Sequence, residues 1–286
     1  MSDAAKDSAL APKSGNFGDL GPRVGSALVL VALAVGSAAY GGEIFVFFWL
    51  ATSFAVVWEW QGLIGGARRL ARVALAGCAI AAAAGMARGG EPAAGLVVLV
   101  ALSGVVGVLA GPGRRLWAFV GVLYAAALVL SVDALRLSDQ FGALAIGWLF
   151  AIVWGADVFA YFGGRLIGGP KLWPRISAGK TWSGTIVGVV SGALLGLAVA
   201  RFGAGEAVKT LPMFLVCLVA AALAQVGDLF ESAVKRRFGV KDSSRLIPGH
   251  GGVMDRVDGF IFVALFAATV GGWRDAVSAA AGLFTW

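Results

Sequence analysis

The sequence predicts an all-α, polytopic integral membrane protein. Of the 286 residues, 59% are hydrophobic and 14% are charged, whereas soluble domains are typically about 45–50% apolar and about 25% charged. The apolar residues also occur in runs of about 16 to 21, close to the roughly 20 residues that a helix needs to cross a bilayer. These observations exclude a water-soluble domain. The 43 glycines are expected where helix backbones pack closely.

The apolar runs predict nine transmembrane helices. Eight is the alternative, because the ninth run is short and begins with an acidic residue. Residues 276–286 are too few to cross a bilayer, so we expect them at the interface. The predicted spans are residues 24–40, 43–58, 70–87, 93–111, 116–134, 141–161, 183–200, 210–229 and 258–273.

The chain divides into three predicted parts. Residues 1–23 mix charged residues with small and polar ones and are expected to form a disordered cytoplasmic tail. No small-residue cleavage pattern closely follows the first apolar run, so we expect this run to be retained as a helix and not removed as a signal peptide. Residues 24–140 form an N-terminal transmembrane region, and residues 141–286 form a C-terminal transmembrane region that carries the catalytic residues.

Basic residues are distributed unevenly between the two ends of the predicted helices. With the N-terminus in the cytoplasm, 18 of the 23 Lys and Arg residues fall on the cytoplasmic side, which agrees with the enrichment of basic residues in cytoplasmic loops. The net charge of +7 therefore suits anionic lipid headgroups and anionic soluble substrates, not nucleic acid. We expect a protein of the cell membrane whose active site faces the cytoplasm.

Two predicted cytoplasmic segments, 162–182 and 230–257, differ from the other loops in length and content. Residues 229–258 contain ten charged side chains, one in three, which is more than twice the average of the chain. A simple connection between two spans does not need this density of charge. We therefore expect the chemistry of the protein in these two segments.

Four acidic residues at the ends of predicted spans are candidates for that chemistry, because ionisable residues in membrane spans are costly and usually functional. They are Asp157, Asp228, Asp255 and Asp258. Asp255 and Asp258 are three residues apart and would share one face of a helix. Carboxylates from two helices could hold Mg²⁺, which takes one or two carboxylates together with phosphate oxygens and water.

The same acids have a structural alternative, which is pairing with the abundant Lys and Arg residues at the interface. Asp157 in particular could be satisfied by Tyr161 and Arg165, which follow it one and two helical turns later. Glu59 lies between two tryptophans and is expected simply to end a helix.

A glycine-rich turn, Gly249-His250-Gly251-Gly252, directly precedes the predicted helix that contains Asp255. Glycines let backbone N–H groups approach a phosphate, and a helix N-terminus favours an anion. Because basic residues flank the turn, it is interpreted as a phosphate-binding site. The alternative is a tight turn that binds no ligand, which is the more common role of such a glycine-rich segment. His250 is expected to contact substrate or to order the loop, not to bind a metal.

The segment 177–184 imitates the end of a P-loop at Gly179-Lys180-Thr181 but fails the full pattern. A P-loop needs a glycine five positions earlier, where this chain has Pro174, and a preceding strand, where it has a membrane span. Lys180 and Thr181 can still bind phosphate as a cation and a hydroxyl group at the start of a span.

Residues 232–258 closely resemble the signature of the phosphatidate cytidylyltransferases, also called CDP-diglyceride synthases. Gly227-Asp228 and the run from Asp157 to Thr181 are similar to other blocks of that family. The chain departs from the family at residues 178 and 183, where Ala and Ser replace the usual Pro and Glu. The matching residues of the signature are Ser232, Lys235, Arg236, Lys241, Asp242, Pro248, His250, Gly251, Gly252, Asp255, Arg256 and Asp258.

The resemblance implies a Mg²⁺-dependent reaction of CTP with phosphatidic acid that gives CDP-diacylglycerol and pyrophosphate. It also implies a homodimer among membrane lipids. Because CTP is soluble and the site is expected on the cytoplasmic side, we expect the phosphatidic acid to come from the cytoplasmic leaflet. Asp228, Asp255, Lys241 and Asp258 are the predicted catalytic residues, and Asp228 and Asp255 are the predicted metal ligands. The predicted substrate-binding residues are Ser177, Lys180, Thr181, Ser232, Lys235, Arg236, Asp242, His250, Gly251, Gly252 and Arg256.

Other functions compete with this interpretation. A related CTP-dependent enzyme could act on another lipid phosphate or on a lipid alcohol. A transporter, which belongs to a different class, would place its acids near the middle of the membrane in two related halves. The acids here gather at one end of the predicted spans, which favours an enzyme.

Overall fold

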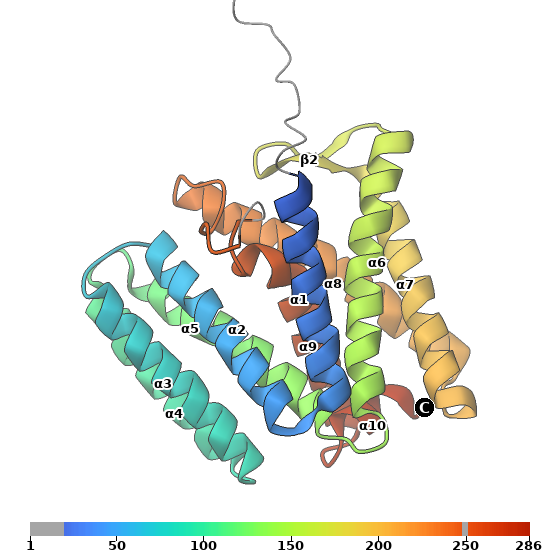
Figure 1. Ribbon diagram of the computed structural model, residues 1–286, viewed down its shortest axis with the longest axis horizontal. Coiled ribbons are helices and arrows are strands. Elements are labelled where there is room, and N and C mark those ends of the chain that lie inside the picture. Colours follow the sequence, from blue (N-terminus) through green and yellow to red (C-terminus); the bar gives the residue numbers. More distant parts are fainter. Residues whose placement is uncertain (1–19, 248–250) are drawn as a thin grey trace, which may run out of the picture.

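The computed structural model describes residues 20–247 and 251–286. In this part of the chain, α-helices and one short antiparallel hairpin account for the regular structure (Figure 1). The elements are α1 (Leu20–Tyr40), α2 (Gly42–Leu63), α3 (Arg69–Arg88), α4 (Pro92–Ala110), α5 (Arg115–Arg136), α6 (Gly142–Leu166), β1 (Lys171–Trp173), β2 (Ser177–Thr181), α7 (Trp182–Ala204), a 3₁₀ turn (Gly205–Ala207), α8 (Thr210–Arg237), α9 (Met254–Arg274) and α10 (Ala279–Phe284).

Each predicted span coincides with one helix. Eight helices, α2 to α9, are long and apolar enough to cross a membrane, and the apolar part of α1 is the shorter stretch Gly25–Tyr40. The ninth predicted span, expected to be short, forms α9 with 21 residues, and α10 is too short to cross, as predicted. Of the predicted tail 1–23, the last four residues belong to α1 and residues 1–19 lie outside the described part.

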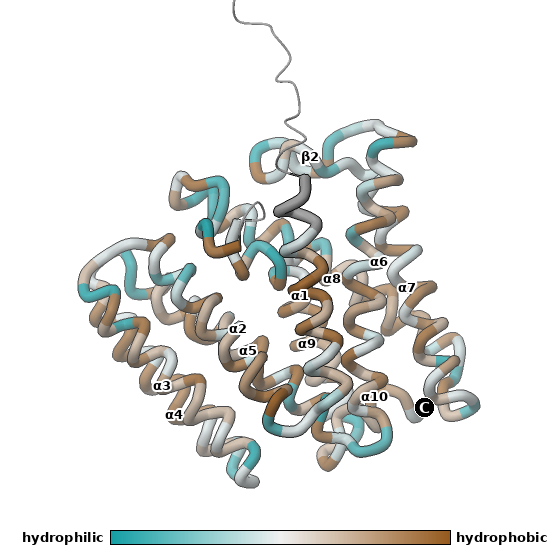
Figure 2. Tube along the Cα trace, in the orientation of Figure 1, coloured by the Kyte–Doolittle hydropathy of each residue, from teal (hydrophilic) through white to brown (hydrophobic). Residues whose placement is uncertain are grey.

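The helices form one bundle that is polar at both ends and apolar between them (Figure 2). In Figure 1, α3 and α4 lie at one side, α6 and α7 lie at the other, and α1 crosses between them. Figure 2 shows that hydrophilic residues gather in the loops and at the helix ends, with hydrophobic residues between them. The hairpin and the described residues 238–247 and 251–253 of the loop before α9 lie at the same end of the bundle, which we call the loop end.

Small residues bring α6 and α7 together. Gly184, Gly188 and Gly192 repeat at four-residue spacing along α7, so they share one face of the helix. A Cβ atom at Gly184 would lie 2.7 Å from the carbonyl oxygen of Ala160, and one at Gly188 would lie 2.5 Å from that of Ala156. The two backbones are therefore in direct contact, as is common between membrane helices. This contact fixes the second half of α6 beside the start of α7.

A second close contact joins α8 and α9 near the loop end. A Cβ atom at Gly227 would lie 2.6 Å from the carbonyl oxygen of Asp258, and one at Gly259 would lie 2.9 Å from that of Ala224. Only glycine allows this approach. It places the residue that follows Gly227, Asp228, next to Asp258 on the neighbouring helix.

The two polar segments are more ordered than the sequence indicates. Helix α8 continues to Arg237, so the predicted loop 230–257 is reduced to residues 238–253. Lys and Arg near a helix C-terminus are favourable for its dipole, and both are good helix formers, which explains the extension. Segment 162–182 contains the hairpin, in which Lys171 pairs with Thr181 and Trp173 with Ser177. The all-α prediction did not include this hairpin.

Candidate active site

A polar cavity of about 470 Å³ opens between α6, the hairpin, α7 and α8. Lys180 at the end of β2 reaches across it to α8. Its Nζ donates to Asp228 Oδ2 and, at 3.2 Å, to Gln225 Oε1. The side chains of Lys180 and Asp228 are 21% and 22% exposed, so this ion pair is partly accessible to a bound molecule. The cavity is lined by Asp157, Ala160, Tyr161, Gly164, Arg165, Gly179, Lys180, Thr181, Gly184, Thr185, Gln225 and Asp228.

The other predicted residues of the hairpin have different positions. Thr181 lines the cavity, and its hydroxyl caps α7 by accepting from the Gly184 N–H at 3.1 Å. Ser177 lies at the far end of β2, paired with Trp173, and is not among the described residues that line the cavity. Ser183, where the family usually has Glu, donates to the Gly168 carbonyl oxygen. Here it holds the turn before the hairpin.

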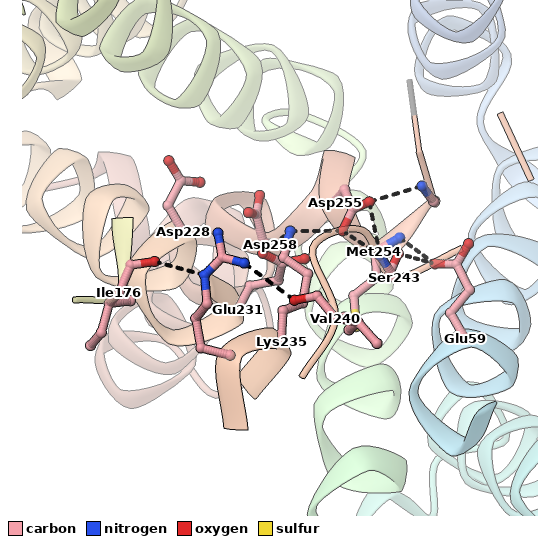
Figure 3. Close-up of polar contacts among 12 residues, drawn as sticks. Glu59, Ile176, Asp228, Glu231, Lys235, Val240, Ser243, Met254, Asp255 and Asp258 are labelled. Carbon is pink, nitrogen blue, oxygen red and sulfur yellow. Dashed lines mark hydrogen bonds and ion pairs between the residues drawn. The ribbon is translucent and has the colours of Figure 1, made fainter. Parts of the chain in front are cut away.

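Three of the four candidate acids lie at or beside this cavity. Asp157 from α6 lines it together with Asp228, and the carboxylates of both lie near enough for their charges to interact. Asp258 lies next to Asp228 across the α8–α9 contact (Figure 3). The alternative partners of Asp157 are engaged with each other, because Arg165 donates to the Tyr161 hydroxyl at 3.3 Å.

The fourth acid, Asp255, belongs to a buried ion-pair network. Lys235 Nζ donates to Glu231 Oε2 at 2.7 Å and to Asp255 Oδ1 at 3.1 Å. The side chains of Glu231 and Asp255 are only 2% and 8% exposed. Lys235, predicted to clamp phosphates, is thus held between two carboxylates of the protein. Sequence reasoning missed Glu231, although its position four residues before Lys235 on a helix was a signal for an ion pair.

The glycine-rich turn accommodates this network. The backbone N–H groups of Ser243 and Gly252 donate to Asp255, at 3.2 and 2.9 Å. Gly251 has φ +83°, and a Cβ atom there would lie 2.5 Å from Asp255 Oδ2. The glycines therefore let the loop wrap around a carboxylate of the chain itself. The N–H of Gly252, predicted to bind a phosphate, is already used by Asp255.

Glu59 of α2 holds the other side of the same loop. Its carboxylate accepts from the N–H groups of Val253 and Met254 at 2.9 and 2.7 Å. It also accepts from the hydroxyls of Ser244 and Ser243 at 2.6 and 3.3 Å. The prediction that Glu59 simply ends a helix was wrong, because α2 continues to Leu63. Glu59 is 2% exposed and caps the N-terminus of α9, a favourable place for a negative charge.

The remaining signature residues lie around these groups. Arg236 donates to the carbonyl oxygens of Ile176 and Val240, each at 3.4 Å, and so joins the hairpin to the loop (Figure 3). Ser232 is half-buried one turn after Asp228 on α8, whereas Lys241, Asp242 and Arg256 are exposed. His250 lies outside the described residues.

The acids provide hard oxygen donors of the type that Mg²⁺ prefers. Within the described residues, no three His, Cys, Asp or Glu side chains converge closely enough to hold an ion. Mg²⁺ is usually bound through one or two carboxylates together with water and substrate phosphates, so such a site does not require three of these side chains. Asp228, with one lysine partner and an opening to the cavity, fits such a ligand better than Asp255, which already accepts from Lys235 and two backbone N–H groups.

Comparison with known proteins identifies relatives of this chain. A model of the cytidylyltransferase family matches residues 22–272. The phosphatidate cytidylyltransferase of Brucella abortus is 40% identical over 248 residues, 86% of this chain and 91% of that protein. The phosphatidate cytidylyltransferase of Bacillus subtilis is 40% identical over 132 residues, which is 46% of this chain and 49% of that protein. That of Helicobacter pylori is 43% identical over 128 residues, which is 44% and 46% of the two chains.

The residues that the family model matches include the elements that form the candidate site. Residues 22–272 include the cavity between α6 and α8, the ion-pair network of Asp255 and the residue of α2 that holds the loop. The resemblance predicted from residues 232–258 is confirmed, and the chain belongs to the cytidylyltransferase family.

Proposed function

We propose that this chain transfers the cytidylyl group of CTP to phosphatidic acid, giving CDP-diacylglycerol and pyrophosphate. The observation that carries the proposal is the partly exposed ion pair of Lys180 and Asp228 in a cavity at the loop end, beside Asp157 and Asp258. Such a site combines a cation for phosphate with carboxylates for a metal. The Brucella abortus relative, which matches 86% of this chain, and the Bacillus subtilis relative, which matches 46% of it, are both named phosphatidate cytidylyltransferases. These names support the same activity.

The proposed reaction is an in-line displacement. An oxygen of the phosphatidate phosphate forms a bond to the α-phosphorus of CTP, while the bond from that phosphorus to the β-phosphate oxygen breaks and pyrophosphate leaves. Because a phosphate monoester is largely ionised at neutral pH, the attacking group needs no general base. The chain has to hold two anions in line and to balance the developing charge.

The cations at the loop end have this positioning role in the proposal. Lys180 at the cavity, together with Arg236 and Lys241 near the loop, would bind the CTP phosphates. Arg256 at the start of α9 would bind the phosphatidate phosphate. Lys235 has a different role here, because its charge is balanced by Glu231 and Asp255. It would keep Asp255 and the loop 238–253 in place.

Mg²⁺ is the proposed cofactor, with Asp228 as its main ligand and Asp157 and Asp258 as the nearest further carboxylates. When bound, the metal would neutralise phosphate charge and orient the two reacting groups. Asp255, the second ligand predicted from the sequence, would act by holding the loop around it.

The orientation of the protein is a further part of the proposal. The loop end would face the cytoplasm, since CTP is soluble and most basic residues of the chain were assigned to that side. Phosphatidic acid would then come from the cytoplasmic leaflet. Assembly as a homodimer is the expectation of the family resemblance, and chemical crosslinking in membranes tests it.

The activity is tested with purified protein, labelled CTP and phosphatidic acid in detergent. We expect labelled CDP-diacylglycerol to form and to be lost in Asp228→Asn. Parallel reactions use diacylglycerol or a polyprenyl phosphate as acceptor and dCTP or ATP as donor. Faster product formation from diacylglycerol or polyprenyl phosphate than from phosphatidic acid would refute the proposed acceptor, and wild-type turnover by Asp228→Asn would refute the proposed site.

A further inference from the structure

A second cavity, of about 380 Å³, lies between α1, α2, α6 and α9. Its lining is apolar apart from Thr52 and Arg256. The hydroxyl of Thr52 donates to the Phe48 carbonyl oxygen at 2.8 Å within α2, so its hydrogen bond is made inside the helix. Arg256 is therefore the charged group of this cavity, which we call the apolar groove.

Four aromatic rings form one wall of the apolar groove. Trp154 stacks on Phe150 with ring centroids 4.6 Å apart and an interplanar angle of 9°. Phe150 stacks on Phe260 at 5.5 Å, and Phe260 stacks on Trp49 at 5.1 Å. Stacked rings from three helices support one another, so this wall is a continuous apolar surface that does not depend on a ligand for its shape.

The apolar groove begins at the loop end and runs toward the middle of the helices. Arg256 is the third residue of α9, and Phe260 follows one turn further in. On α1 the groove is lined from Ala27 to Ala34, which corresponds to about 10 Å of helix at about 1.5 Å per residue. The charged end of the groove is thus at the level of the loop, and its apolar part lies within the span.

The polar end of the groove lies near the candidate active site. Arg256 lines the groove, and its charge acts on Asp157. Asp157 in turn lines the polar cavity that contains Lys180 and Asp228. A molecule with its anionic group at Arg256 and its apolar part in the groove would therefore present that anion to the polar cavity.

We propose that the apolar groove binds an acyl chain of the phospholipid substrate, with the phosphate of the lipid at Arg256. The groove matches the two halves of such a molecule, an anion next to a long hydrocarbon chain. A peptide segment is a poor occupant, because its backbone N–H and C=O groups would find few partners in this lining. The inference rests on the proposed function for the identity of the lipid and adds where the lipid is held.

Photolabelling tests the groove without requiring turnover. The probe is phosphatidic acid that carries a diazirine in the middle of one acyl chain, added to the full-length protein in detergent without CTP. We expect crosslinks to peptides of α1, α2, α6 and α9 that line the groove. Diacylglycerol with the same diazirine is expected to label these peptides about tenfold less, because it lacks the phosphate for a charge-assisted bond to Arg256.

A groove-filling variant gives the matched comparison. Ala55 of α2 lines the groove, and Ala55→Phe should reduce labelling about tenfold, the effect of losing about two buried methylene contacts. The control is Ala101→Phe on an exposed position of α4, expected to label like the wild type. In turnover, Ala55→Phe should raise KM for long-chain phosphatidate more than for short-chain phosphatidate.

The outcomes separate the two proposals. Crosslinks of the wild type outside the groove, or equal labelling of Ala55→Phe and Ala101→Phe, would overturn the groove proposal. Groove labelling in a protein that forms no CDP-diacylglycerol would instead reject the proposed function and leave the lipid site standing. Product formation with crosslinks elsewhere would reject the groove alone.

Discussion

The contact of Glu59 with the signature loop predicts that a residue of the N-terminal half controls turnover. Glu59→Gln keeps the size of the side chain but replaces one carboxylate oxygen by an amide nitrogen. In the wild type, each carboxylate oxygen of Glu59 accepts one hydrogen bond from a backbone N–H at the start of α9, that of Val253 or Met254. Each oxygen also accepts one hydrogen bond from a serine hydroxyl. The serine hydroxyl can rotate away, whereas the backbone N–H next to the new amide loses its acceptor.

The magnitude follows from these contacts. Leaving one buried N–H without an acceptor costs about 1–3 kcal/mol. Removing the negative charge at the N-terminus of α9 adds about 0.5–1 kcal/mol. Part of this penalty is absorbed by the other contacts of the loop, which Asp255 also holds. We therefore expect kcat to decrease by at least about tenfold, the effect of about 1.4 kcal/mol.

The assay measures cytidylyl transfer to phosphatidic acid over a range of CTP concentrations. A positioning role predicts a lower kcat with little change in KM for CTP. It also predicts faster cleavage by trypsin after Lys241 and Arg245, which are exposed on the loop, without a matching decrease in Tm. The control is Glu43→Gln at the opposite end of the same helix, where the side chain is 70% exposed. A kcat of Glu59→Gln within about twofold of the wild type, with unchanged loop cleavage, would refute the reasoning.

Three further predictions concern the cavity and the helix contacts that shape it. Lys180→Met removes the cation that we propose binds the CTP phosphates and is expected to lower kcat/KM for CTP by about 100-fold, measured by initial rates, with Lys180→Arg recovering part of it. Gly188→Ala forces α6 and α7 apart and should lower Tm by several degrees in a thermal-shift assay, whereas Gly147→Ala, whose Cβ meets nothing within 4 Å, should not. Chelation of divalent cations should abolish turnover. The Mg²⁺ concentration that restores half of the activity should rise more in Asp228→Asn than in Asp255→Asn. The reverse order would make Asp255 the main ligand.

Local patterns in the sequence were sufficient for most of the fold. The spans follow from hydropathy alone, because each apolar run is long enough to form its own helix and needs no partner to be recognised. The boundaries at the loop end were less accurate, since α8 continues through Lys235, Arg236 and Arg237 beyond its apolar part. Hydropathy marks where a helix leaves the apolar region, whereas capping and helix propensity decide where it ends.

The site was predictable only where its residues are close in sequence. Asp255, Asp258 and the glycine turn form one contiguous motif, so the sequence alone places them together. Glu59 lies 194 residues before Val253, whose N–H it accepts, and no local pattern connects two such positions. Lys180 and Asp228 were each singled out, but their pairing depends on the hairpin, which the all-α interpretation did not contain.

The glycines of the glycine-rich turn make room for a different group from the one that the sequence suggested. Glycines were expected because a phosphate must approach the backbone. In the structure, a Cβ atom at Gly252 would lie 2.6 Å from Glu59 Oε1, and one at Gly251 would lie 2.5 Å from Asp255 Oδ2. Both glycines thus admit carboxylates of the chain itself, an anion with the same demand for space and N–H donors as a phosphate.

The acids of the site fall into two groups, those that accept from the backbone of the loop and those that face the polar cavity. Asp255 and Glu59 accept hydrogen bonds from backbone N–H groups of the loop and of the start of α9, on two sides. Both carboxylates therefore hold the start of α9 in one position. Asp228 pairs with a lysine from the hairpin and faces the open cavity, which is why we propose this carboxylate as the main metal ligand. Because Arg256 and Asp258 belong to the helix turn that Asp255 and Glu59 fix, a movement of the loop would shift Arg256, the cation that we propose for the lipid phosphate, together with Asp258, the acid beside Asp228. The start of α9 is therefore positioned by Asp255 and Glu59, and substitution of either carboxylate should lower kcat through the positions of Arg256 and Asp258.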